Sequence, residues 1–215
     1  MLYNPILFDL DGTLTDPKLG ITRSVAYALR HFGIETENPD SLTKFIGPPL
    51  RDSFRQFCGF SDEQAETAVA KYREYFAETG IFENTPYDGM PELLQKLRSA
   101  GKTLAIATSK PRVYAERIAE RFGFAGFFDF IAGSELDGGR SEKNELITYA
   151  LESLGVRDRR GAVMIGDREF DMRGAAKLGI DGIGVLWGYG SEDELLAAGA
   201  ARVVRDFAEL EKALL

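Results

Sequence analysis

The chain has 215 residues, 44% apolar and 28% charged, which suits one domain with a modest insertion and a buried core of its own. Its formal net charge of −8 argues against a nucleic acid or an anionic membrane as partner, because both favour a basic face. The single cysteine cannot form an internal disulfide, no segment reaches the length of a membrane span, and the N-terminus has neither the charged region nor the cleavage site of a signal peptide. We therefore expect a cytoplasmic protein.

The first predicted strand covers residues 5–8 and ends in two carboxylates, Asp9 and Asp11, followed by Gly12. Side chains two apart on a strand point to the same side, so the two carboxylates would face one site. Gly12 lets the chain turn and brings backbone N–H groups close to a ligand. Carboxylates this close repel each other unless a cation or a proton relieves them. Taken alone, a strand end with turn chemistry explains the segment about equally well.

Residues 15–84 show helical spacing and no strand pattern. Two helices are predicted, Leu19–Phe32 and Ser61–Thr79, and each is followed by a glycine. We predict that this stretch is a helical insertion. Residues 1–14 and 85–215 would then form the remaining domain.

From residue 88 onward, helices alternate with strands. The predicted elements are helix Met90–Ser99, strand Lys102–Ala107, helix Pro111–Phe122, strand Phe128–Ala132, helix Lys143–Leu154, strand Ala162–Ile165 and helix Arg168–Leu178. This alternation predicts an α/β fold with a doubly wound parallel sheet, a Rossmann-like core. Polar residues at the strand ends would gather at one edge of that sheet, where open α/β folds bind ligands.

Two further segments carry polar groups suited to an anion. The strand ending at Ala107 leads into Thr108 and Ser109, and Pro111 is predicted as the first residue of the next helix. Hydroxyls near a helix N-terminus suit an anion, although N-capping alone would also account for them. Lys143 opens a later helix, where a cation opposes the macrodipole unless something negative lies opposite. The alternative is a solvated surface lysine.

A second acidic strand end lies far downstream, where Asp167 follows the apolar run and Asp171 comes four residues later. Both carboxylates would lie near the first turn of one helix and face the same way. Asp171 alone is equally typical of a helix-start acid favoured by the macrodipole. Together with Asp9 and Asp11, however, the four carboxylates indicate a site for a hard divalent cation with oxygen ligands, most consistent with Mg²⁺.

In this order the motifs resemble those of the haloacid dehalogenase-like hydrolases. The matching segments are Asp9–Thr13, Thr108, Lys143 and Gly166–Asp171, and the match spans nearly the whole chain. The chain is most similar to the phosphoglycolate-phosphatase and beta-phosphoglucomutase branch, because Phe45–Phe54 resembles that branch's cap loop. The resemblance implies that the helical insertion is a mobile cap domain. It also implies a phosphatase that acts on a small phosphorylated metabolite.

The resemblance also implies roles for individual residues. Asp9 would be the nucleophile that forms an aspartyl-phosphate, and Asp11 would donate and later accept a proton. The remaining phosphoryl oxygens would be held by Thr108, by Lys143 and by the backbone N–H groups around Gly12, with Ser109 beside them.

The same resemblance implies a ligand set for magnesium. A carboxylate oxygen of Asp9, the carboxylate of Asp167 and the backbone carbonyl of Asp11 would hold the ion. Asp171 would bind it directly or support its ligands.

Two other functions stay open at this point. Mutases of the same branch carry a histidine early in the first cap helix, where this chain has Gly20, Ile21 and Thr22, which favours hydrolysis. A non-catalytic binding or regulatory module that has kept the fold is the alternative from another class, and the intact motifs speak against it. The oligomeric state is expected to be a monomer or a homodimer.

The substrate is not identified by these residues. Phosphoglycolate, pyrophosphate, a nucleoside monophosphate and a sugar phosphate all fit. Arg51, in the expected cap loop, could bind an anionic group remote from the transferred phosphoryl, and a surface arginine at a helix start is the equal alternative.

Overall fold

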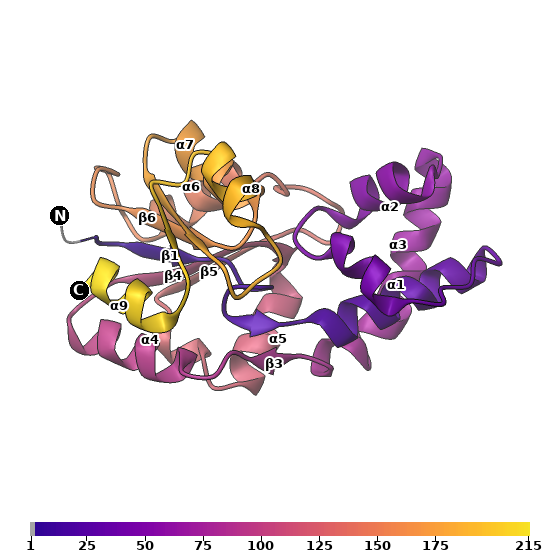
Figure 1. Cartoon of the computed structure of the whole chain (residues 1–215), viewed down its shortest axis with the longest axis horizontal. Helices are drawn as coiled ribbons and strands as arrows, with labels where there is room; N and C mark the ends of the chain where they lie inside the picture. The colour runs from indigo at the N-terminus through magenta and orange to yellow at the C-terminus, as the bar shows by residue number, and fades with distance from the viewer. Residues whose placement is uncertain (1–2) are drawn as a thin grey trace. The chain divides into compact units, whose positions relative to one another are not determined.

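The computed structural model describes residues 3–215, which divide into two compact units (Figure 1). One unit comprises the residues up to Asp16 together with Pro86–Leu215, and the other is Pro17–Thr85. The chain passes between the units through two short strands, β2 (Thr15–Asp16) and β3 (Thr85–Pro86), which pair in a two-stranded sheet.

The larger unit is built on a six-stranded sheet with the order β5-β4-β1-β6-β7-β8. Its strands are β1 (Ile6–Phe8), β4 (Leu104–Pro111), β5 (Phe130–Ser134), β6 (Val163–Gly166), β7 (Asp181–Val185) and β8 (Arg202–Val204). Every neighbouring pair is parallel, which confirms the predicted fold class. The strand order reverses beside β1, because β4 lies on one side of it and β6 on the other. Open α/β sheets bind ligands at such a point.

Helices cover both faces of this sheet. They are α4 (Met90–Ser99), α5 (Arg112–Arg121), α6 (Lys143–Ser153), α7 (Glu169–Lys177), α8 (Glu192–Ala197) and α9 (Phe207–Leu214), with a short 3-10 turn, η3 (Ala125–Phe127). Figure 1 shows α6, α7 and α8 on one face and α4, α5 and α9 on the other. A strand buried on both faces is apolar throughout rather than alternating, as β1 and β6 are. Leu7 and Met164 belong to one core cluster with Leu146 and Ile147 of α6.

The smaller unit is helical. It contains α1 (Lys18–His31), η1 (Pro39–Phe45), α2 (Leu50–Cys58), α3 (Asp62–Phe76) and η2 (Gly80–Phe82). Helix α3 begins where the sequence predicts, because Ser61 and Gln64 form a reciprocal capping box. The core between the helices is aromatic, and Phe54 packs against Phe45 and Phe60. Nowhere in residues 3–215 does a helix combine the length and apolar character needed to cross a membrane.

Two local predictions are wrong. Strand β4 does not stop at Ala107 but continues to Pro111, and α5 begins at Arg112. Pro111 is therefore not the first helical residue; its ψ of 132° is extended, so it ends the strand. The stretch Phe45–Phe54 resembles a loop, yet its second half, from Leu50 onward, belongs to α2, whose left-handed C-cap is Gly59.

Within the smaller unit, α1 and η2 meet backbone to backbone. Gly20 donates its N–H to the Glu83 carbonyl at 2.9 Å. A Cβ added at Gly20 would lie 2.0 Å from the Gly80 carbonyl oxygen, which cannot move without displacing η2. The glycine in α1 is thus required by packing rather than by backbone conformation.

We expect Gly20→Ala to destabilise the protein by about 1–2 kcal/mol, because the overpacking penalty exceeds the gain of about 1 kcal/mol in helix propensity. Urea unfolding of the two proteins measures the difference. Gly126→Ala is the matched control, since a Cβ at Gly126 would meet nothing within 4 Å. A stabilised Gly20→Ala protein would contradict the close packing of α1 against η2.

Candidate active site

Three buried carboxylates meet at the carboxyl ends of β1 and β6. One oxygen from each of Asp9, Asp167 and Asp171 lies within 4.8 Å of the others. Strands β1 and β6 are neighbours, and the Asp9 N–H donates to the Ile165 carbonyl at 2.9 Å, so the residues that follow the two strands come together. Asp171 joins them from the first turn of α7, where its Oδ2 accepts from the Arg168 N–H at 3.1 Å.

Lys143 lies among these carboxylates as the first residue of α6. Its Nζ is 2.9 Å from Asp9 Oδ1 and 2.8 Å from Asp171 Oδ1, and it donates to the Ala107 carbonyl at 3.0 Å. The side chain is buried, so the surface-lysine alternative is wrong. Burial acts to lower the pKa of Lys143, but the negative charges of Asp171 and Asp9 outweigh it and raise that pKa above its usual value. Lys143 is therefore a fixed cation in the site.

One ammonium group does not balance three carboxylates. Burial raises the pKa of Asp167 well above its ordinary value, and the charges of Asp171 and Asp9 add to the rise. Burial likewise raises the pKa of Asp171 to about 6, although Lys143 opposes the shift. The Oδ1 atoms of Asp9 and Asp171 are buried and face Lys143 as ion pairs without hydrogen-bond geometry. Buried hard oxygen donors with excess negative charge fit a divalent cation such as Mg²⁺.

Asp11 stands apart from this group and pairs with a second lysine. Its Oδ2 is 2.6 Å from Lys110 Nζ, and both side chains are buried. Burial raises the pKa of Asp11, while the charge of Lys110 opposes the rise. A metal contact through the Asp11 backbone carbonyl stays a prediction. Lys110 is not among the predicted site residues, because the predicted strand ends at Ala107. On the longer strand, Thr108 and Lys110 alternate with Ser109 and are both buried.

The turn after β1 is pressed against Asp167. Gly12 has a φ of +85°, and a Cβ added there would lie 2.3 Å from Asp167 Oδ2, so both conformation and space require glycine. Thr13 donates its hydroxyl to Asp167 Oδ1 at 3.3 Å. The Gly12 N–H itself donates to the Thr15 carbonyl at 2.8 Å. The N–H groups of Thr13, Leu14 and Thr15 donate to the Leu10 carbonyl. A contact between backbone N–H groups of this turn and phosphoryl oxygens stays a prediction.

The two hydroxyl residues of β4 do not cap the following helix, because α5 has no side-chain cap. The N-capping alternative is thus wrong for both. Thr108 is buried, and its Oγ1 accepts from the Lys110 N–H at 3.3 Å. Ser109 is half-buried and donates to the Ser141 carbonyl at 3.3 Å, which ties β4 to the loop before Lys143. Contacts of either hydroxyl with substrate stay predictions.

Arg51 belongs to the smaller unit and has partners there. It lies in the first turn of α2, and its guanidinium is 3.1 Å from Glu66 and 3.7 Å from Asp62 on α3. The side chain is 51% exposed. Such an exposed pair contributes little to stability, so these contacts can be exchanged for others at small cost.

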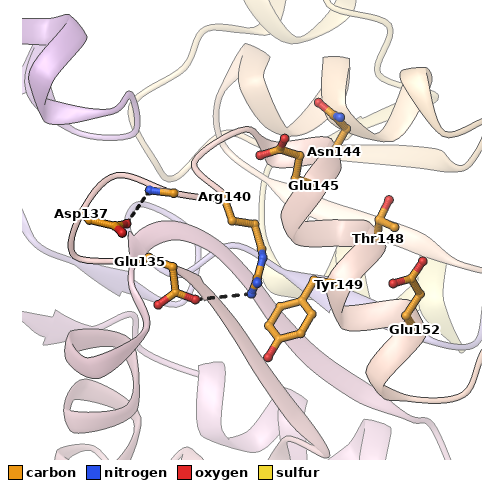
Figure 2. Close-up of a pocket in the computed structure, with 9 residues that line it drawn as sticks. Glu135, Asp137, Arg140, Asn144, Glu145, Thr148, Tyr149 and Glu152 are labelled. Atoms are coloured by element: carbon orange, nitrogen blue, oxygen red, sulfur yellow. Dashed lines mark hydrogen bonds and ion pairs between the residues drawn. The ribbon is translucent and has the colours of Figure 1, made fainter.

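A shallow hollow beside α6 is separate from the carboxylate group (Figure 2). In the close-up, the guanidinium of Arg140 lies over the ring of Tyr149, 3.8 Å from its centroid, and also pairs with Glu135. None of the residues predicted for the site lines this hollow. Its lining is Glu135, Asp137, Gly139, Arg140, Asn144, Glu145, Thr148, Tyr149 and Glu152.

Comparison with known proteins gives consistent similarities. A 5'-nucleotidase of Pseudomonas aeruginosa is 50% identical over 212 residues, which cover 99% of this chain and 96% of that protein. The tyrosine-protein kinase PtkA of Mycobacterium tuberculosis is 43% identical over 188 residues, and the match spans 87% of this chain but only 64% of that protein's length. The crystal structure of a predicted phosphatase from Clostridium acetobutylicum is 49% identical, with a TM-score of 0.96 over 100% of this chain and 99% of that one.

The family model described as haloacid dehalogenase-like hydrolase matches residues 6–185, a range that holds Asp9, Lys143 and all the other residues of the carboxylate group. The chain therefore belongs to the haloacid dehalogenase-like hydrolase family.

Proposed function

We propose that this protein is a magnesium-dependent phosphatase that hydrolyses a small phosphorylated metabolite through an aspartyl-phosphate. The observation that carries the proposal is the group formed by Asp9, Asp167, Asp171 and Lys143, buried where two parallel strands end. The residues that fit Mg²⁺ are the three aspartates, with the Asp11 carbonyl as a fourth donor. When bound, Mg²⁺ would supply positive charge that offsets the negative charge of the carboxylates and of the phosphoryl group.

In the first half of the reaction, a carboxylate oxygen of Asp9 attacks phosphorus. The bond from Asp9 to phosphorus forms as the bond from phosphorus to the leaving oxygen breaks, and that oxygen takes a proton from Asp11. The ammonium of Lys143, 2.9 Å from Asp9 Oδ1, holds the nucleophile in orientation. Burial favours the protonated form of Asp11 by raising its pKa, as a proton donor requires.

In the second half, water attacks the phosphorus of the aspartyl-phosphate and gives its proton to Asp11. Phosphate leaves, and Asp9 regains its carboxylate. Lys110 stabilises Asp11 between these steps, when Asp11 is negatively charged. Each carboxylate thus returns to its starting form after one turnover.

The interior of the smaller unit argues against the mutase alternative. Gly20, Ile21 and Thr22 are all buried in α1, and a Cβ at Gly20 already has no space. A histidine at this position could not be accommodated without moving η2. The intact carboxylate group argues against a non-catalytic module, because three buried carboxylates facing one ammonium group destabilise a fold that has no use for them.

Nucleoside 5'-monophosphates are the first substrates to test, since the relative that is 50% identical bears the name 5'-nucleotidase. Phosphoglycolate, pyrophosphate and sugar phosphates complete the panel, and kcat/KM ranks them. The expectations of a cytoplasmic location and of a monomer or homodimer stay predictions.

We expect Asp9→Asn to lower kcat for an aryl phosphate by about 10³-fold or more, because the amide keeps the shape of the side chain but cannot attack phosphorus. Phosphate release and far-UV circular dichroism are measured together. Asp158→Asn, a change at an exposed aspartate paired with Arg160, is the matched control. Near-normal turnover in folded Asp9→Asn would rule out the covalent mechanism.

The rise in Tm that Mg²⁺ causes should be larger at about pH 8 than at about pH 5. The raised pKa values of Asp167 and Asp171 mean that the metal-free folded protein binds more protons than the unfolded chain. The stability they contribute is therefore present at low pH and is lost as pH rises through the folded values, about 6 for Asp171. Mg²⁺ binds the ionised carboxylates. It therefore restores the most stability at the higher pH, where the metal-free protein has lost the most.

Differential scanning calorimetry in chelator and in Mg²⁺ at the two pH values tests this. Asp167→Asn should remove most of the magnesium effect at both. An equal shift in Tm at the two pH values would contradict a metal site built from these carboxylates.

We expect Arg51→Ala to lower kcat/KM for phosphoglycolate, because a charged contact with the distal carboxylate is lost. The loss of transition-state stabilisation that this ratio measures should be on the order of 2 kcal/mol or more. An aryl phosphate without a distal anion should change little. Arg55→Ala is the matched control, because Arg55 also lies on α2, pairs with Asp62 and has a 52% exposed side chain. Equal losses of kcat/KM on both substrates, or no loss on either, would mean that Arg51 is a surface residue that does not bind the distal carboxylate.

A further inference from the structure

The loop that follows β7, residues 186–190, lies against the carboxylate group. Tyr189 donates its backbone N–H to Asp167 Oδ2 at 2.8 Å. The glycines on either side of it allow the approach. A Cβ at Gly188 would lie 2.4 Å from both Asp167 Oδ2 and the Gly12 carbonyl, and one at Gly190 would lie 2.0 Å from the Asp167 carbonyl.

The same loop is anchored by two side chains, one bonded to the turn after β1 and the other to β2. The indole N–H of Trp187 donates to the Thr13 carbonyl at 3.0 Å, and its ring packs against Phe207 with centroids 4.5 Å apart. The hydroxyl of Tyr189 donates to Asp16 Oδ1. Tyr189 is thus held at both ends, its hydroxyl by Asp16 and its backbone N–H by Asp167.

Both oxygens of Asp167 are oriented by this arrangement. Thr13 donates to Oδ1, and Tyr189 donates to Oδ2. An aspartate with both oxygens held in this way presents its remaining lone pairs in fixed directions, which a metal ion with strict octahedral geometry needs.

We propose that Tyr189 is a positioning residue for Asp167, and that its hydroxyl acts through the hydrogen bond to Asp16. The hydroxyl fixes the loop so that the backbone N–H stays aimed at Asp167 Oδ2. The inference rests on the proposed function, because it takes Asp167 to be a magnesium ligand.

Tyr189→Phe tests the inference, since it keeps the ring and the backbone donor and removes only the hydroxyl. We expect the Mg²⁺ concentration at half-maximal effect to rise about tenfold, both in a thermal-shift titration and in phosphate release, with kcat largely restored at saturating Mg²⁺. Tyr3→Phe is the matched control. The hydroxyl of Tyr3 also donates to an aspartate, Asp181 at 2.6 Å, but on an exposed face.

Asp16→Ala is a second variant that breaks the same hydrogen bond from the other side. Combined with Tyr189→Phe, it should raise the half-maximal Mg²⁺ concentration no further than either change alone, because residues that act as one unit are not additive. Additive effects, or a Tyr189→Phe protein with lowered Tm and the magnesium affinity of Tyr3→Phe, would overturn the inference and leave the proposed function intact. Failure of the unaltered protein to bind Mg²⁺ would overturn both.

Discussion

Repulsion among Asp9, Asp167 and Asp171 is the constraint around which the rest of the larger unit is arranged. Each buried charge costs several kcal/mol in desolvation, and removing the partner of a buried ion pair typically costs about 3–5 kcal/mol. Lys143 relieves part of the repulsion, and Lys110 does the same for Asp11. When all four carboxylates are ionised, these two lysines leave two negative charges in excess, which is the charge that one divalent cation neutralises.

Glycines lie around this group, and the absence of their side chains leaves space for the carboxylates. A Cβ at Gly166 would lie 2.1 Å from the carboxyl carbon of Asp171, just as Gly12 and Gly188 leave room for Asp167. Strand pairing supplies the rigidity, because β1 lies between β4 and β6 at the centre of the sheet. The site therefore combines fixed strand ends, glycines that leave space for the carboxylates, and two buried lysines. Preorganisation of this kind is what electrostatic catalysis requires.

Much of this arrangement could be predicted from the sequence. Alternating helices and strands identify the parallel sheet, and acids placed directly after apolar runs identify Asp9 and Asp167, because strand ends are marked locally. Lys110 could not be found in the same way, since its role depends on β4 continuing for four residues past the apolar run. The 186–190 loop was missed because its contacts with Asp167 join distant parts of the chain. Its local signal is the closely spaced pair Gly188 and Gly190, shortly after the end of β7.

The helical unit leaves the rest of the chain through β2 and returns through β3, and these two strands pair with each other. Its two ends are therefore neighbours, so a tight turn is enough to close the gap if the whole segment is absent. Every residue of the carboxylate group lies outside it. The length and sequence of the inserted segment can therefore change without altering any residue of the carboxylate group.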